Sequence, residues 1–183
     1  GSKAAAFALL LRFFVEALLP AVGDWQLIIV IMAALTMVFG NLVALTQKNI
    51  KRLMAYSSIG HVGYLLMGIA ALAAIDNNDK VQLQLSHLAS NGLMFHLVAY
   101  GITNLALFLG LTSVYNVTGK DDIADLSGLG QRAPLVAMVI ASALFSLGGL
   151  PIFAGFISKF YLFNAAASQG LLWLAGLAIF TSL

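Results

Sequence analysis

Lysine and histidine are the residue types in this chain that could carry out chemistry, because each can gain and lose a proton. Lys159 is the first candidate, since it follows the Gly-Gly-Leu-Pro run at 148–151 and is the only formally charged residue between positions 133 and 183. An ammonium group at bilayer depth is costly unless water, a partner or loss of the proton relieves it. Burial favours the neutral amine, and an approaching charge restores the ammonium. The sequence therefore predicts that Lys159 handles protons; the alternative is that its long side chain reaches a membrane interface.

A break in the helix that carries Lys159 supports this prediction. Pro151 has no amide hydrogen and clashes with the carbonyl four residues earlier, and the paired glycines weaken the helix further. Backbone carbonyls near Leu147 are therefore expected to lose their partners. Within a membrane, such a break persists where protein or a water-filled cavity supplies hydrogen bonds, as along transport routes. A simple proline kink is the alternative, but Lys159 lies only about 12 Å further along the helix, which favours a transport route.

Lys3 and His96 are the next candidates. Lys3 would lie near the middle of the membrane if its helix extends upstream by about eight residues. As the third residue of an intact chain it would be a solvated end, and an initial Gly-Ser left by cloning is a further alternative. His96 lies within a long uncharged segment, and imidazole titrates close to neutral pH, which suits it to pass a proton between two lysines. A hydrogen-bonded structural histidine is the other interpretation.

Other polar residues have a structural interpretation beside a functional one, or only a structural one. His61 lies in a polar stripe with Tyr56, Ser57, Ser58 and Tyr64, whose hydroxyls could hold a chain of water molecules but also serve as ordinary contacts between helices. Arg12 and Glu16, four residues apart, are expected to form an ion pair near the membrane interface. The chain has no cysteine, no metal-ligand spacing and no glycine-rich phosphate loop. No cofactor or metal site is therefore expected, and hydrolytic or nucleotide chemistry is disfavoured.

The composition explains how these residues reach bilayer depth. Of the 183 residues, 61% are apolar and only 9% are charged, and the mean hydropathy is +0.98, far above the values of soluble domains. Uncharged runs long enough to cross about 30 Å of hydrocarbon recur along the chain. We predict an all-α fold, a polytopic transmembrane helix bundle that forms one domain over residues 1–183. The net charge of +2 is too small to imply nucleic-acid binding.

The pattern predicts about six membrane segments, one of them broken at Gly148 to Pro151. The segments are expected at 2–19, 25–47, 53–75 and 88–115, then in two parts at 134–146 and 153–167, and finally from about 169 onward. Gly23 and Asp24 are expected to form a turn, and a short amphipathic surface helix is expected within 117–133. We expect the first and last helices to continue beyond residues 1–183, so that the chain would be an excerpt of a longer membrane protein.

Basic residues in the connections predict the orientation. If the crossings alternate, the connections at 46–52 and 116–133 lie on one side of the membrane, opposite the loop that contains Lys80. Together they hold Lys48, Lys51, Arg52, Lys120 and Arg132. Short loops rich in lysine and arginine face the cytoplasm. The chain is therefore expected to be a multi-pass protein of the cell inner (cytoplasmic) membrane, with both connections cytoplasmic.

Two stretches of the sequence resemble a known family. The sequence QKNIKRLMAYSSIGHVGY at 47–64 closely resembles the signature of the antiporter-like membrane subunits of respiratory complex I, and GLPIFAGFISKFY at 149–161 resembles their broken twelfth helix. The resemblance covers essentially the whole chain. It implies that residues 1–183 are part of a proton-translocating module, from helix 8 to the start of helix 13 of a 14-helix subunit. One departure is Ile152, where family members often have proline or leucine between the proline and the phenylalanine.

This resemblance implies a set of site residues and partners. Lys3 would match the central lysine of helix 8, Lys159 the lysine of helix 12 near the exit route, and Lys51 the lysine that opens helix 10; His96 follows less directly. A glutamate and a lysine that the family uses further upstream fall outside residues 1–183. The implied partners are other membrane subunits of complex I and the lipid bilayer, with quinone and NADH handled by partner subunits.

Three classes of function follow from these residues. In the first, the protein is a proton-translocating subunit of the enzyme NADH:quinone oxidoreductase; it does no redox chemistry itself and moves protons through buried lysines while quinone is reduced elsewhere. In the second, it is a subunit of a multisubunit cation/proton antiporter, a group that shares the same signature. In the third, Lys3 and Lys159 pair with fixed anions in a structural scaffold. The resemblance favours the first class.

Overall fold

The computed structural model describes residues 2–18, 21–72 and 80–182, with side chains for 5–14, 17–18, 21, 23–72 and 87–182. This part of the chain is helical throughout, apart from short connections and a β-bridge between Asn49 and Asp122. The helices are α1 (Ser2–Arg12), α2 (Val22–Leu45), α3 (Ile50–Leu72), α4 (Lys80–Thr118), α5 (Leu129–Arg132), α6 (Pro134–Gly148), α7 (Ala154–Ser168) and α8 (Leu172–Ser182). A π-helical turn (Phe13–Ala17) follows α1, and a 3₁₀ turn (Ile123–Leu126) precedes α5.

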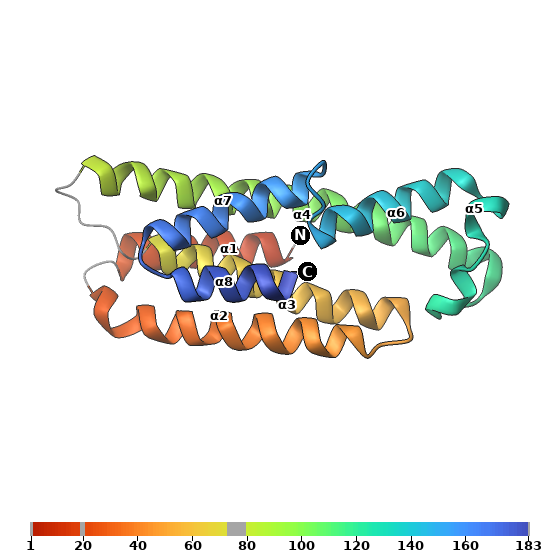
Figure 1. The fold of residues 1–183 in the computed structure, drawn as a ribbon, viewed down its shortest axis with the longest axis horizontal. Coiled ribbons are helices and arrows are strands. Elements are labelled where there is room, and N and C mark those ends of the chain that lie inside the picture. The colour runs from red at the N-terminus through yellow and green to blue at the C-terminus, as the bar shows by residue number, and fades with distance from the viewer. Residues whose placement is uncertain (1, 19–20, 73–79, 183) are drawn as a thin grey trace.

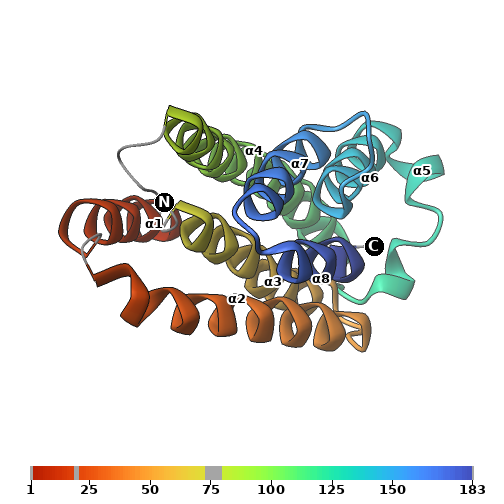
Figure 2. The same ribbon diagram turned by 60° about the vertical axis from the view of Figure 1, so that its left-hand side comes forward.

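The helices run roughly parallel to one long axis of the molecule (Figure 1). Helix α4 has 39 residues and is about 58 Å long at 1.5 Å per residue, so it extends along most of the bundle. Helices α6 and α7 follow one another along α4 and pack against different parts of it. Helix α3 lies inside the bundle between α2, α4 and α8, as the turned view in Figure 2 shows. These arrangements bring the middle of α3, the middle of α4 and the α6–α7 break together.

Lipid-facing composition confirms the prediction of a polytopic membrane helix bundle. Among the described residues, three helical segments are long and apolar enough to cross a membrane: Gly23–Leu45, Ile50–Leu72 and His87–Thr118. Large apolar side chains remain exposed along them, for example Leu35 and Phe39 on α2 and Ile102 and Leu105 on α4. Such surfaces are unfavourable in water but suit contact with lipid chains.

Small residues let α2 and α3 approach closely. A Cβ atom added at Gly40 would come within 2.5 Å of the backbone nitrogen of Gly60, and one at Gly63 would meet the side chain of Met37. Close backbone approach of this kind increases dispersion contacts, which drive helix association in membranes. The close α2–α3 contact fixes the face of α3 that turns toward α4.

The predicted order of helices is confirmed, with three corrections to the boundaries. The predicted turn at Gly23 and Asp24 is wrong: both residues lie in the first turn of α2, where the Asp24 carboxylate is favoured by the positive end of the helix dipole. The predicted helix at 88–115 is longer and occupies 80–118. In place of one surface helix within 117–133 there are a 3₁₀ turn at 123–126 and the four-residue helix α5 at 129–132. The predicted helix ends at Leu19 and Ile75 fall outside the described residues.

Two apolar clusters fill the interior, and a set of buried polar residues separates them. The first cluster includes Met37, Tyr64, Leu93, Leu162 and Leu174, and the second includes Met54, Leu107, Leu111, Ile140 and Leu147. Between the two clusters, along α3, α4 and the α6–α7 pair, lie His61, His96, Ser158 and Lys159, all buried. We call these four residues the polar layer. Because buried polar groups must be hydrogen-bonded to be tolerated, their partners identify the candidate site.

Candidate functional site

The α6–α7 break places a free carbonyl beside the amine of Lys159. Helix α6 ends at Gly148 and α7 begins at Ala154, which confirms the predicted broken helix. In a continuous helix the carbonyl of Leu147 would accept a hydrogen bond from residue 151, but that residue is proline and has no donor. Instead, Nζ of Lys159 donates a hydrogen bond of 2.8 Å to the oxygen of Leu147. The proline therefore creates the acceptor that holds the lysine.

Two glycines shape the space in which Lys159 lies. Gly149 adopts φ +87°, a left-handed conformation that terminates α6, and a Cβ atom there would lie 3.4 Å from Nζ of Lys159. Gly155 lies against the end of α6, where an added Cβ would overlap the carbonyl oxygen of Ser146. The chain thus folds back tightly at the break. Lys159 is 3% exposed as a result.

Hydrogen bonds connect three members of the polar layer. Nδ1 of His61 lies 3.3 Å from Nε2 of His96, and Nδ1 of His96 lies 2.9 Å from Oγ of Ser158. The Ser158 hydroxyl donates to the carbonyl oxygen of Gly155 at 3.0 Å. Since that hydroxyl hydrogen is already used, Ser158 accepts from His96, and His96 in turn accepts from His61. The pattern is a directional chain of donors that runs from α3 through α4 to α7.

Two tyrosines enclose this chain. The ring of Tyr64 lies 5.1 Å from Nζ of Lys159 and contacts His96 edge to face, with 6.5 Å between the ring centroids. Tyr64 therefore touches both the lysine and the histidine, and its ring face can stabilise an ammonium group. Tyr100 packs against His61 with ring centroids 4.7 Å apart and an angle of 36° between the ring planes. The aromatic rings limit the space that water can occupy around the polar layer.

Hydroxyl groups continue from the polar layer toward the second cluster. Oγ of Ser146 lies 3.3 Å from Oγ1 of Thr103 and accepts a hydrogen bond of 3.3 Å from the amide of Gly155. Ser146 is buried, and Thr103 is partly buried. This pair joins α4 to the α6–α7 break. It gives that break a second polar attachment besides the Lys159 contact.

The predicted site residues are not all brought together. Lys159 and His96 lie in the polar layer, but Lys51 lies ten residues before His61 on α3, about 15 Å along the helix axis. Nζ of Lys51 lies 3.1 Å from Oδ2 of Asp121 and 3.7 Å from the centroid of the Tyr115 ring. The backbone of Lys3 belongs to α1, whereas its side chain, like that of Glu16, falls outside the described part. The roles predicted for Lys3 and Lys51, and the ion pair between Arg12 and Glu16, therefore remain predictions.

The Lys51–Asp121 pair is one of several contacts between the connection at 46–52 and the connection at 116–133. We call these contacts the clamp. The amide of Ile50 donates to the oxygen of Asp121 at 3.0 Å, and the amide of Ile123 donates to the oxygen of Lys48 at 2.9 Å. Hydrogen bonds from Asn49 and then from Lys51 lower the pKa of Asp121 below its ordinary 3.8. Because the folded pKa is lowered, this carboxylate stabilises the clamp fully above pH 3.8, and the contribution disappears as the pH falls through the lowered value.

Asp121→Asn is expected to speed amide hydrogen exchange at Ile50 and Ile123 by about twofold to fivefold at neutral pH, since partly exposed ion pairs contribute little. Hydrogen exchange read by mass spectrometry measures this change. In the unsubstituted protein, the protection of these two amides, taken as the intrinsic exchange rate at each pH divided by the observed rate, should fall as the pH drops below 3.8. Asp122→Asn, a neighbouring charge-matched control, should leave this protection nearly unchanged. Equal effects of the two substitutions would show that the Lys51 contact does not support the clamp.

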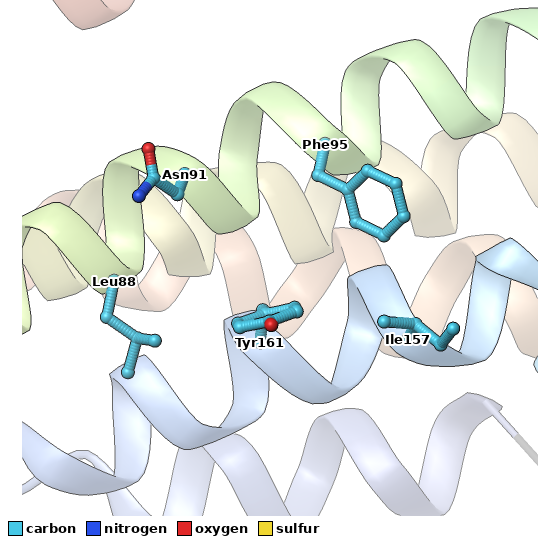
Figure 3. Close-up of a pocket in the computed structure, with 5 residues that line it drawn as sticks. All are labelled: Leu88, Asn91, Phe95, Ile157 and Tyr161. Atoms are coloured by element: carbon cyan, nitrogen blue, oxygen red, sulfur yellow. The ribbon is translucent and has the colours of Figure 1, made fainter.

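A groove on the outer side of α4 and α7 is separate from the polar layer. It has a volume of about 390 Å³ and is lined by Leu88, Asn91, Phe95, Ile157 and Tyr161. Figure 3 shows Asn91 and Phe95 on α4 facing the groove above Tyr161 and Ile157 on α7. Phe95 and Ile157 precede His96 and Ser158, so the outward side chains form the groove while the next residue along each helix turns inward. The groove adds no acid or base to the buried site.

Sequence reasoning missed two members of the polar layer. His61 was placed in a polar stripe that could hold a chain of water molecules or serve as ordinary helix contacts, without a role of its own, and Ser158 was not singled out. The available signal was their position: His61 shares its stripe with Tyr64, and Ser158 directly precedes Lys159 in the helix that follows the break. Among the described residues, no three histidine or carboxylate side chains lie close enough to share a metal ion.

Comparison with known proteins assigns the chain to a family. Residues 1–183 match the transmembrane family described as NADH:quinone oxidoreductase/Mrp antiporter. The chain belongs to this family. It is 42% identical over 183 residues to NADH-quinone oxidoreductase subunit N of Heliobacterium modesticaldum, and 43% identical over 182 residues to subunit N of Moorella thermoacetica. Each alignment covers 100% of this chain but only 36% of the relative. The motif SSIGHVGY at 57–64 and the lysine at position 159 favour subunit N within the family, in agreement with these relatives.

Solved structures support the same assignment. One chain of the Mrp complex from Dietzia superposes with a TM-score of 0.80 and 26% identity, covering 97% of this chain and 30% of that chain. A chain of respiratory complex I from Thermus thermophilus with bound NADH gives a TM-score of 0.77 at 26% identity, covering 94% of this chain and 35% of that chain. The chain thus spans about a third of these proteins. It is an antiporter-like, multi-pass membrane chain, related to subunits of both kinds of complex.

Proposed function

We propose that this chain forms a proton-transfer unit of a membrane subunit of NADH:quinone oxidoreductase, in which Lys159 holds and releases protons. The observation that carries the proposal is the buried lysine at a helix break, hydrogen-bonded to the Leu147 carbonyl and adjoining the His61–His96–Ser158 chain. A lysine held by one neutral acceptor responds to nearby charge more readily than one locked in an ion pair. The proposed subunit contributes no redox chemistry; other subunits bind NADH and quinone.

The histidine chain supplies a route for protons to reach Lys159. A proton arriving at Nε2 of His61 releases the Nδ1 proton to His96, and His96 passes its own Nδ1 proton to Oγ of Ser158. As Oγ of Ser158 takes up this proton, its own hydroxyl proton, turned from the Gly155 carbonyl toward Lys159, leaves through a bridging water. Each step exchanges one proton for another, so no lasting charge accumulates on the histidines. The neutral amine of Lys159 accepts the proton, and the Leu147 carbonyl and the Tyr64 ring stabilise the resulting ammonium.

The membrane setting follows from this role. We assign the chain to the cell inner membrane, with the connections at 46–52 and 116–133 facing the cytoplasm, because these connections carry most of the basic residues. The third class of function, a scaffold with fixed ion pairs, is disfavoured for Lys159 because its hydrogen-bond partner is a neutral carbonyl. Lys3 and Lys51 are proposed to act elsewhere along the same route.

The second candidate function is a subunit of a multisubunit cation/proton antiporter. The likeness to a chain of the Mrp complex, with a TM-score of 0.80, favours this alternative. The two functions differ in their energy source. Full-length protein purified with its native partners and placed in liposomes should acidify or alkalinise the lumen when NADH and quinone are supplied. Sodium-driven proton exchange without any redox partner would instead assign the protein to the antiporters.

His96→Gln is expected to reduce quinone-coupled proton transport about a hundredfold or more while quinone reduction continues. Glutamine can hydrogen-bond to Ser158 and His61, but its amide cannot accept and return a proton at neutral pH, so it removes an acid–base step worth roughly two or more powers of ten. A pH-sensitive dye in proteoliposomes measures transport. If glutamine restores transport that His96→Phe abolishes, the histidine is a structural hydrogen-bonding residue and the relay is wrong.

A further inference from the structure

A polar pocket at the end of α4 differs from the apolar surfaces around it. It has a volume of about 350 Å³ and is lined by Thr118, Lys120, Ala124, Asp125, Ser127 and Arg132. The lining residues belong to the end of α4 and to the connection from α4 to α6. This connection passes through α5 at the end of the bundle opposite the start of α4 (Figure 1). Two cationic side chains and two hydroxyl groups line a small space. This combination is typical of sites for phosphate groups.

The charges of the lining leave a net positive site. Nζ of Lys120 lies 3.3 Å from Oδ1 of Asp125, so the carboxylate in the lining already has a cationic partner. The lining as a whole carries a formal charge of +1 from Lys120, Arg132 and Asp125. The guanidinium of Arg132 folds back over the loop, since a Cβ atom at Gly128 would lie 3.9 Å from its Nη2. Its planar donors suit the paired oxygens of a phosphodiester.

The pocket begins where the lipid-facing surface ends. Val117 is 87% exposed on α4, three residues before Lys120, and Leu135 is 77% exposed on α6, three residues after Arg132. Just beyond the end of α4 and just before the start of α6, exposed apolar residues are therefore replaced by basic residues. This change marks the boundary between hydrocarbon and the headgroup region.

We propose that this pocket binds the headgroup phosphate of an anionic phospholipid, whose acyl chains lie along the apolar surfaces of α4 and α6. Arg132 and Lys120 bind the phosphate oxygens, and Thr118 and Ser127 donate to the remaining oxygens or to the polar head. A soluble phosphate would use the same donors but would gain nothing from Val117 and Leu135. The apolar neighbours therefore favour a lipid, and the site is independent of proton transfer through Lys159.

The test uses the full-length protein with its native partners, reconstituted in phosphatidylcholine vesicles with or without phosphatidylglycerol. A spin-labelled phosphatidylglycerol competes with unlabelled lipid for the protein, and its immobilised fraction gives the relative affinity. Arg132→Gln is expected to lower the preference for phosphatidylglycerol about fivefold, the effect of one basic residue near a membrane surface. Arg132→Lys should restore part of it, and raised salt should weaken the preference of the unsubstituted protein.

Lys48→Gln is the matched control, because Lys48 is an exposed basic residue on the same set of connections but does not line the pocket. If Arg132→Gln and Lys48→Gln reduce the preference for phosphatidylglycerol equally, the preference comes from general surface charge and the proposed binding site is wrong. An unchanged preference in Arg132→Gln also overturns the proposal. If inorganic phosphate displaces the labelled lipid completely at millimolar concentration, the pocket is a site for soluble phosphate rather than for lipid.

Discussion

Lys159→Met is expected to lower proton transport through this subunit about a hundredfold during quinone reduction, since it removes the group that accepts the proton. Methionine is unbranched and similar in length, so it fills the space beside Gly149 without creating a large cavity. Quinone reduction should continue, because the substitution lies outside any redox site. The measurement is the number of protons moved per quinone reduced in proteoliposomes.

The energetics explain why assembly should survive this substitution. Loss of the lysine leaves the Leu147 carbonyl without a partner, at a cost of about 1–3 kcal/mol. The same substitution also removes an amine from a site that is 3% exposed, and burial of a charged amine in such surroundings is itself unfavourable. These two effects oppose one another. The amount of assembled protein should therefore remain close to normal.

Lys48→Met is the matched control, because it removes an exposed lysine from a connection outside the bundle. It should leave both transport and assembly unchanged. A correctly assembled Lys159→Met protein that moves the normal number of protons per quinone would contradict the proposed role of Lys159. A protein that fails to assemble would contradict the energetic argument, and Lys159→Arg, which keeps a cation, would then reveal whether the carbonyl contact alone is required.

Gly155→Ala is expected to destabilise the fold by roughly 3 kcal/mol or more, at the upper end of the range for overpacking. The added methyl group would overlap the carbonyl oxygen of Ser146, which belongs to the backbone and cannot move away without opening the α6–α7 break. The contact of Lys159 with Leu147 would be lost in the same movement. We therefore expect both a lower unfolding temperature in detergent and reduced proton transport.

Gly148→Ala provides the comparison at the same break. Nothing lies within 4 Å of a Cβ atom built at Gly148, and the residue ends α6 without a positive φ. Alanine there should leave the unfolding temperature within a few degrees of normal or raise it slightly, because alanine favours the helix. If the two substitutions lower the unfolding temperature equally, the close approach of Gly155 to Ser146 does not hold the two helices together.

The sequence predicted the broken helix and its lysine because their causes are local. Pro151 removes a donor and the paired glycines weaken the helix, so a free carbonyl at Leu147 follows from the chain itself. Hydropathy likewise predicted the long crossings at 25–47 and 53–75, since each needs only an uninterrupted apolar run. The turn at Gly23 and Asp24 was predicted wrongly because both residues favour turns in isolation, whereas Asp24 is also favourable in the first turn of a helix.

The hydrogen-bonded chain could not be predicted from the sequence, because it depends on the rotation of three helices about their axes. His61 and His96 are 35 positions apart, and Ser158 is 62 positions beyond His96. Small residues between these helices, such as Gly68 on α3 and Gly92 on α4, let α3, α4 and α7 pack closely enough for the three side chains to meet. Local patterns give the face of a helix that is polar, but the partner across the interface comes from packing.

The position of the polar layer between two apolar clusters has an electrical consequence. Dry apolar packing resists the movement of ions far more than a chain of polar groups does, so most of the membrane voltage falls across the two clusters. A charge crossing the full voltage gains or loses about 2.3 kcal/mol per 100 mV. A proton moving within the polar layer experiences little of this voltage, whereas its entry and exit through the clusters experience nearly all of it. The two clusters are therefore where a membrane potential would resist proton movement and where a leak would have to be blocked.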